Sequence, residues 1–358
     1  MSETELKLSK IRKWLTERKL DGLYLQRVSS FAWATCGAIS YVNIASTFGD
    51  TSLLITHDRQ YLFTNNIEAP RLEIEEKLVS QGWNFRVTPW HTSQNAVPES
   101  IRGLKVGSDS YFPGTEDFSA ELARLRANLT PEEGQRFRDL GQRCAQAMAA
   151  AAMTVRPGQT EHEIAGRLSS EAESRGVQVI VNLIATDERI FSFRHPLPTI
   201  KKLEKYAMLV LCGRWSGLVC SVTRFLHFGR LPDDIRNKSE AVGRIDAAMI
   251  VATRPGHTLG DVFKTGMGEY LRAGYPNEWR LHHQGGPAGY EPREYFAFPR
   301  STDLVAAGQV YAWNPSITGC KSEDTILVGE AGNEVLTEIT DWPKLVVDGM
   351  ERPAILVV

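Results

Sequence analysis

The chain has 358 residues, a length that normally makes two domains, and 42% of its residues are apolar, enough to build proper cores. A net charge of −2 and a pI near 6.5 argue against an electrostatically driven nucleic-acid or membrane partner. No apolar run is long enough to cross a bilayer, and the charged N-terminal residues lack a signal-peptide core, which favours a cytoplasmic location. Five widely spaced cysteines, an odd number, are typical of a protein with reduced thiols.

The first 128 residues alternate between helical and strand patterns. Leucine, isoleucine and tryptophan at helical spacing predict a helix over residues 5–19, and a strand begins at Leu23. Two strands around a polar turn follow within residues 51–64, then a helix over 67–81 and a strand over 101–107. Such alternation predicts an α/β domain.

A helix-start signal places the domain boundary between residues 128 and 129. Thr130 is an expected N-cap, Pro131 suits the first turn, and Glu133 completes a capping box. The helix that they open is predicted to run to about Thr154.

The second block contains an internal repeat. An Arg-Pro-Gly-x-Thr segment at residues 156–160 precedes a predicted helix over 161–176, and the same pattern at 254–258 precedes a predicted helix over 259–274. Each of the two helices ends at a glycine, a common C-cap. Two such starts, each preceded by another helix, indicate a duplicated α/β half.

Four segments stand out in the second block, at residues 210–224, 283–292, 313–315 and 322–325. In their order along the chain and in their residue pattern, these segments resemble the pita-bread family, which includes methionine aminopeptidase, aminopeptidase P, prolidase and creatinase. The resemblance covers essentially the whole chain. It implies an α/β (α+β) fold with a small creatinase-type N-terminal domain, residues 1–128, followed by a pseudo-twofold pita-bread domain, residues 129–358.

The family's metal ligands are mostly replaced in this chain. The two aspartate positions fall on Val210 and Ser221, and the first glutamate position falls on Asn314, so that only His283 and Glu323 keep ligand residues. A pair of hard divalent ions needs bridging carboxylates and several anionic ligands. We therefore predict no metal and no other cofactor. A register shift of two residues would instead bring Cys212, a possible zinc ligand, near the first position.

His283 is the predicted general acid/base, as the resemblance to metal-free creatinase implies. Glu323 is predicted to bind a cationic substrate group or to orient His283. Alternation along the strand puts Asp324 on the opposite face, where we expect a structural role. His282 is expected to be packed or to support the site, and Cys212 or Cys220 is a minor candidate nucleophile with His283 as its base.

Six further residues are predicted to contact the substrate. The amide of Asn314 can both donate and accept, and an arginine can clamp a carboxylate bidentately, although a surface salt bridge is the more common use of arginine. The predicted contacts are His195, Tyr290, Asn314, Arg194, Arg293 and Trp313.

The sequence therefore favours a metal-independent, creatinase-like hydrolase or lyase acting on a C–N bond of a small amino-acid or amidine-like substrate. Two rivals stay open: an inactive peptidase homologue that serves as a binding protein, and a divergent metal-dependent X-Pro peptidase. The resemblance also implies a homodimer whose N-terminal domain lies near the partner's site, with Arg27, Phe31 and Trp33 as hypothetical lid residues.

Overall fold

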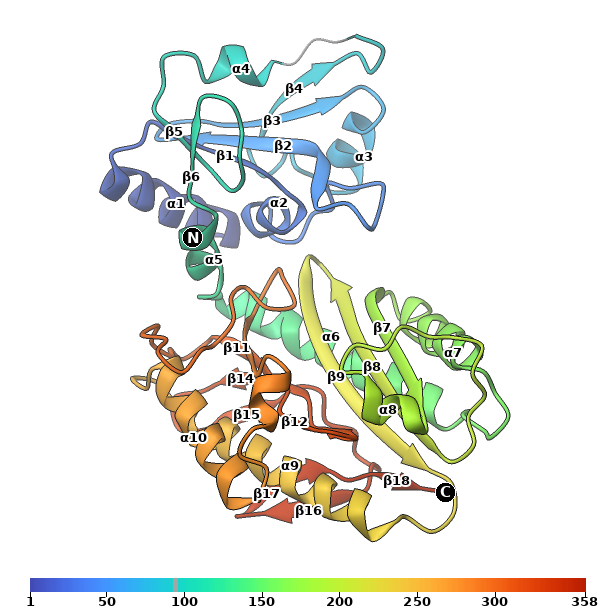
Figure 1. Cartoon of the computed structure of the whole chain (residues 1–358). Coiled ribbons are helices and arrows are strands. Elements are labelled where there is room, and N and C mark those ends of the chain that lie inside the picture. The colour runs from blue at the N-terminus through green and yellow to red at the C-terminus, as the bar shows by residue number, and fades with distance from the viewer. Residues whose placement is uncertain (93–95) are drawn as a thin grey trace. The chain divides into compact units, whose positions relative to one another are not determined.

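The computed structural model describes residues 1–92 and 96–358, which form two compact units, Met1–Arg126 and Ala127–Val358 (Figure 1). The boundary predicted after residue 128 lies within a few residues of this division. Among the described residues, no helix combines the length and the apolar character needed to span a membrane.

The N-terminal unit is built on a six-stranded mixed sheet with the strand order β4-β3-β2-β1-β5-β6. Its elements are α1 (Glu3–Arg18), β1 (Gly22–Arg27), α2 (Val28–Ala34), β2 (Phe48–Thr56), β3 (Gln60–Asn65), α3 (Ala69–Ile74), β4 (Asn84–Thr88), α4 (Val97–Ser100), β5 (Val106–Ser108), β6 (Thr115–Asp117) and α5 (Ser119–Arg126).

The local chemistry of this unit explains its first elements. Helix α1 begins at a capping box between Ser2 and Glu5, and its buried face carries Leu8, Ile11 and Leu15. Strands β2 and β3 form an antiparallel hairpin. The predicted α/β character, the first helix and the hairpin are confirmed.

Three predictions for this unit are wrong. The helix expected over 67–81 is only the short α3, because Lys77 adopts a left-handed backbone (φ 56°) beyond its end. The strand expected from residue 101 is only β5. Phe31 and Trp33 lie in α2, where they are 0% and 1% exposed, so they are core residues of this unit and present no lid surface.

The C-terminal unit contains two four-stranded sheets, with the orders β18-β9-β8-β7 and β10-β11-β14-β15, and two short hairpins. Its elements are α6 (Pro131–Ala152), α7 (Glu161–Glu173), β7 (Gln178–Thr186), α8 (Glu188–Ser192), β8 (Tyr206–Trp215), β9 (Leu218–His227), α9 (Asp233–Ala252), α10 (Leu259–Arg272), the 3₁₀ turn η1 (Glu278–Leu281), β10 (Gly285–Ala288), β11 (Val310–Trp313), β12 (Ser316–Ile317), β13 (Cys320–Lys321), β14 (Asp324–Val328), β15 (Asn333–Val335), β16 (Lys344–Val347), β17 (Met350–Pro353) and β18 (Leu356–Val357).

Each sheet has its own pair of helices, so the unit consists of two similar halves (Figure 1). Helices α6 and α7 pack on β7, β8 and β9, whereas α9 and α10 pack together, with α9 against β11. The second pair encloses an apolar core that includes Tyr270, Tyr311 and Trp313. The two halves meet where β9 contacts β14.

The repeated Pro-Gly-x-Thr starts have the same structure in both halves. Thr160 and Thr258 are the N-caps of α7 and α10, each in a capping box. Each also forms an isolated antiparallel bridge to a later segment, Thr160 to Lys202 before β8 and Thr258 to Leu304 before β11. The duplicated half predicted from the sequence is therefore confirmed.

Candidate functional site

Three histidines from two distant segments meet in the C-terminal unit. His195 lies in the loop after α8, and His282 and His283 lie between η1 and β10. The Nε2 atoms of His282 and His195 are 2.9 Å apart, so one ring donates and the other accepts. The ring centre of His283 lies 4.5 Å from that of His282 and 5.8 Å from that of His195.

These imidazoles also have metal-ligand spacing. Each offers a ring nitrogen, and the three atoms lie within 4.8 Å of one another. Imidazole nitrogen suits zinc, copper, iron and nickel, so one ion of that class is chemically compatible with the three rings. This arrangement differs from the carboxylate-rich cage of the pita-bread metallopeptidases.

Two glycines fix the backbone beside His283. Gly285 has a φ of 107°, and a Cβ atom there would lie 2.2 Å from the carbonyl oxygen of Ala312. A Cβ atom on Gly286 would lie 2.3 Å from the carbonyl oxygen of Tyr295. Only glycine allows β10 to approach its neighbours so closely, and this approach sets the position of the histidine pair.

Glu323 lies in a buried cluster of opposite charges. Its side chain is 3% exposed; Arg293 donates to its Oε1 at 2.9 Å, and the Nζ of Lys321 lies 2.8 Å from its Oε2. Thr223 also donates to Oε2, at 2.6 Å. Burial alone would raise the pKa of Glu323, but Lys321 and Arg293 outweigh it and hold that pKa well below its usual range. Glu323 is therefore ionised near neutral pH.

The three replaced ligand positions lie in the same part of the fold and bring no carboxylate. Val210 is 2% exposed and belongs to an apolar core. The Oγ of Ser221 accepts from Arg293 at 3.2 Å. Asn314 is 2% exposed, and its Oδ1 atom has no hydrogen-bond partner among the described residues. This unsatisfied amide is what a site completed by a ligand would contain.

The histidines are uncharged near neutral pH. Burial lowers the pKa of His283 to about 4, and Arg293 adds to the effect. Burial and the nearby Lys321 lower the pKa of His282 to about 2, and the same two causes lower the pKa of His195. A neutral imidazole can accept a proton, so the chemistry available to His283 begins as base catalysis.

Asp324 has the structural role predicted for it. It receives hydrogen bonds from Arg224 at 2.8 Å, from Arg352 at 2.7 Å and from Thr337 at 2.6 Å. Its neighbour Glu323 points to Lys321 and Arg293 instead, so the two adjacent carboxylates face opposite ways, as strand alternation predicted.

Three predicted substrate contacts have partners inside the protein. Arg194 pairs with Glu278 at 2.5 Å, and the hydroxyl of Tyr290 donates to Glu133 at 2.6 Å. Trp313 is 1% exposed and belongs to the core, which corrects the expectation that it contacts the substrate. The substrate roles of Arg194 and Tyr290 stay predictions, and a substrate would have to compete with these bonds.

Cys212 lies beside the site but is a poor nucleophile. Its Sγ lies 3.3 Å from the Oγ of Ser221, and burial raises its pKa to about 11. The protonated thiol lacks the thiolate that nucleophilic attack requires. The five cysteines are free thiols, as the sequence predicted.

Lys321 is a residue of the candidate site that the sequence analysis did not identify. It lies two positions before Glu323 on an extended segment, and period-two alternation places residues so spaced on the same face. That spacing was the available signal. The family motif begins at Ser322 and does not include this residue.

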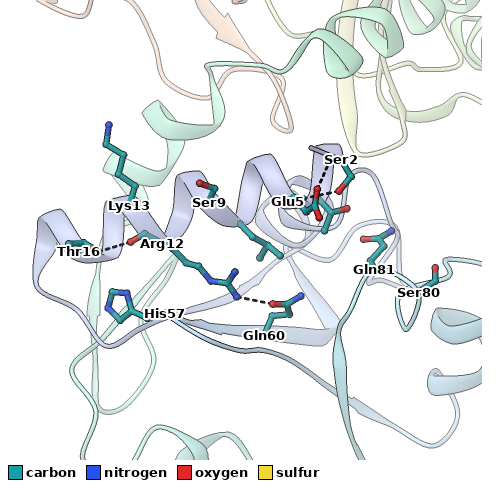
Figure 2. A pocket seen from close by; sticks show the side chains of 12 residues that line it. Ser2, Glu5, Ser9, Arg12, Lys13, Thr16, His57, Gln60, Ser80 and Gln81 are labelled. Atoms are coloured by element: carbon teal, nitrogen blue, oxygen red, sulfur yellow. Dashed lines mark hydrogen bonds between the residues drawn. The ribbon is translucent and has the colours of Figure 1, made fainter.

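A separate pocket of about 800 Å³ lies in the N-terminal unit and contains none of the predicted site residues. Figure 2 shows its polar wall along α1, with Arg12 donating to Gln60 at 2.9 Å and the Ser2–Glu5 capping box at one end. Because these contacts stabilise the unit itself, the histidine cluster is the better candidate for chemistry.

Comparison with known proteins identifies the family and supports the fold. The sequence model of metallopeptidase family M24 matches residues 135–330, and that of the creatinase/prolidase N-terminal domain matches residues 7–141. The Xaa-Pro dipeptidase of Lactobacillus helveticus is 23% identical over 367 residues, which cover 93% of this chain and 96% of that protein.

Solved structures show the same fold. The Xaa-Pro dipeptidase from Bacillus anthracis superposes with a TM-score of 0.81 at 18% identity, covering 99% of this chain and 100% of that one. The prolidase from Pyrococcus horikoshii OT3 has a TM-score of 0.80 at 17% identity and covers 93% of this chain and 98% of its own. The likeness extends over both units.

Proposed function

Since the chain belongs to metallopeptidase family M24 and carries a creatinase/prolidase N-terminal domain, we propose that it is a hydrolase that works without the family's metal pair. Its substrate in this proposal is a small amino-acid-like or amidine-like molecule, and the bond cleaved is a C–N bond. The proposal follows the creatinase-like chemistry expected from the sequence.

The contacts of Glu323 carry the proposal. Both of its oxygens already bind cations of the protein, Arg293 on one side and Lys321 on the other. A divalent ion at this carboxylate would have to displace them and would then lie close to two positive charges. With valine, serine and asparagine at the other ligand positions, these residues do not fit a pair of divalent ions.

The same residues suit a reaction driven by a base. The neutral ring of His283 can take a proton from an attacking water, and its low pKa lets it return that proton readily to the leaving nitrogen. The charges of Arg293 and Lys321 can stabilise negative charge that develops on the substrate. Glu323 then holds the two cations in place.

Cleavage of Xaa-Pro peptides is the second candidate function, and the relatives favour it. The L. helveticus protein and the B. anthracis structure are both described as Xaa-Pro dipeptidases. If this chain cleaves such peptides with a metal, the three histidines are the ligands that its described residues offer. A binding protein without activity is the remaining alternative.

An activity screen separates these functions. Purified protein is assayed with and without a chelator on Xaa-Pro dipeptides and on small amidine and amide substrates, and the His283→Ala variant serves as the control. The proposal predicts chelator-resistant cleavage of a small substrate that His283→Ala loses. Chelator-sensitive Xaa-Pro cleavage would instead favour the second candidate, and no turnover of any substrate would favour a binding protein.

We further propose that the protein is a cytoplasmic homodimer in which the N-terminal domain lies near the partner's site, as the family resemblance implies. Light scattering combined with size-exclusion chromatography measures the mass. A mass of 40 kDa, that of one chain, would contradict the dimer.

A further inference from the structure

We infer that the position of the family's metal pair has become an anion site in this chain, where Lys321 and Arg293 bind the carboxylate of a substrate. This inference rests on the metal-free site of the proposed function and adds to it the charge class of the substrate.

The net charge of the cluster indicates the sign of the charge that its ligand carries. Lys321 and Arg293 contribute two positive charges, and Glu323 contributes one negative charge. The Lys321, Arg293 and Glu323 side chains are 7%, 6% and 3% exposed, so water screens them little. One positive charge remains uncompensated, and buried charges need a partner.

Unused hydrogen-bond donors point to the same ligand. Arg293 gives one terminal nitrogen to Glu323 and the other to Ser221 and Pro292, while its buried Nε has no partner among the described residues. The ammonium of Lys321 has three donors, and its described ion pair with Glu323 uses one direction. An oxyanion accepts from such donors, whereas a cation cannot.

Asn314 adds a third unsatisfied group. Its Oδ1 is buried and has no hydrogen-bond partner within the described part of the chain, and its backbone N–H donates to the carbonyl of Gln284, the residue next to His283. An amide side chain can be rotated to present its NH₂ group, which would donate to a carboxylate oxygen. At position 314, where the family pattern has a carboxylate, this chain therefore has an amide whose NH₂ group can donate to an anion.

The surplus of one charge selects a monoanion. A carboxylate neutralises the cluster, whereas a phosphate dianion would leave it with a net negative charge. The expectation that Glu323 binds a cationic substrate group is replaced here, because Oε1 is bonded to Arg293 and Oε2 to Lys321 and Thr223. Glu323 is the counter-charge of the anion site.

Acetate is the simplest probe of this site. The dissociation constant is obtained from the dependence of Tm on acetate concentration, at constant ionic strength kept with chloride. We expect Lys321→Gln to weaken acetate binding at least about tenfold, because one buried charge is lost, and Lys321→Arg to retain it. Glu323→Gln should tighten acetate binding, since this substitution raises the surplus positive charge of the cluster. Lys344→Gln, in an exposed ion pair with Glu338 and Glu351, is the matched control and should leave it unchanged.

The opposite directions of the Lys321→Gln and Glu323→Gln effects distinguish a charge effect from simple damage to the fold. Equal acetate binding in all variants, or no acetate binding by the wild-type protein, would overturn the inference. Tighter binding of phosphate than of acetate at equal ionic strength would overturn the choice of a carboxylate. Metal-free protein that ignores acetate contradicts the anion site alone, whereas bound metal contradicts the proposed function.

Discussion

Glu323→Gln is the substitution whose effect on stability follows most directly from the structure. It keeps the shape of the side chain and removes the negative charge that Arg293 and Lys321 share at 2.9 Å and 2.8 Å. Removing one partner of a buried ion pair costs about 3–5 kcal/mol, because the charge left behind is neither paired nor hydrated. We therefore expect Glu323→Gln to lower the free energy of unfolding by about 3–5 kcal/mol.

Differential scanning calorimetry measures this loss as a shift in the transition of the C-terminal unit. For a domain of about 150–250 residues, 1 kcal/mol corresponds to roughly 2–4 °C, so Tm should fall by about 6–20 °C. Glu330→Gln, on an exposed residue of the same unit, is the control and should stay within about 0.5 kcal/mol of wild type.

A double-mutant cycle tests the cause of the loss. If Lys321 is destabilising only when its counter-charge is gone, Lys321→Gln combined with Glu323→Gln should cost about 0.5–3 kcal/mol less than the sum of the single variants. A Tm for Glu323→Gln within 2 °C of wild type, or strict additivity in the cycle, would refute the reasoning that the cluster is held together by its charges.

Three more outcomes are expected. Because the pKa values of His282 and His283 are low, the folded state binds fewer protons than the unfolded chain below pH 6.5. The stability of the protein should therefore be highest above pH 6.5 and should fall as the pH falls towards 4. A plot of Tm against pH measures this loss, and a flat profile between these pH values would contradict it. Gly285→Ala should destabilise by about 3 kcal/mol or more through its clash with β11, whereas Gly268→Ala, in open space on α10, should stabilise by about 0.5–1 kcal/mol; urea unfolding compares them, and equal effects would refute the packing argument. Tyr290→Phe should cost about 1.5–3 kcal/mol by removing the bond to Glu133; an unchanged urea midpoint would argue against this structural role.

Most of the fold could be predicted from local residue patterns in the sequence. The capping boxes at Thr130, Thr160 and Thr258 stand at the helix starts predicted from them, because a capping box depends on residues only three positions apart. The helix expected over 67–81 failed because its end is set by the left-handed backbone at Lys77, which the helical pattern of the apolar residues does not reveal.

The candidate site was only partly predictable. The motif resemblance predicted His195, His283 and Glu323 as site residues, and the structure places the ring centres of His195 and His283 5.8 Å apart. Their chemical environment depends on residues outside the motif, and Lys321 is the main example. Trp313 was misjudged because strand alternation alone does not say which face of β11 meets the core and which meets the site.

The metal content of the purified protein tests the central claim most directly. Protein from cells grown with added manganese, cobalt, iron and zinc is analysed by mass spectrometry of its elements, without a metal-affinity tag and before any chelator is used. The account predicts far less than one metal ion per chain, because Lys321 and Arg293 hold the carboxylate that a metal pair would need. Two ions per chain, or one ion that is lost in a His282→Ala variant, would contradict it.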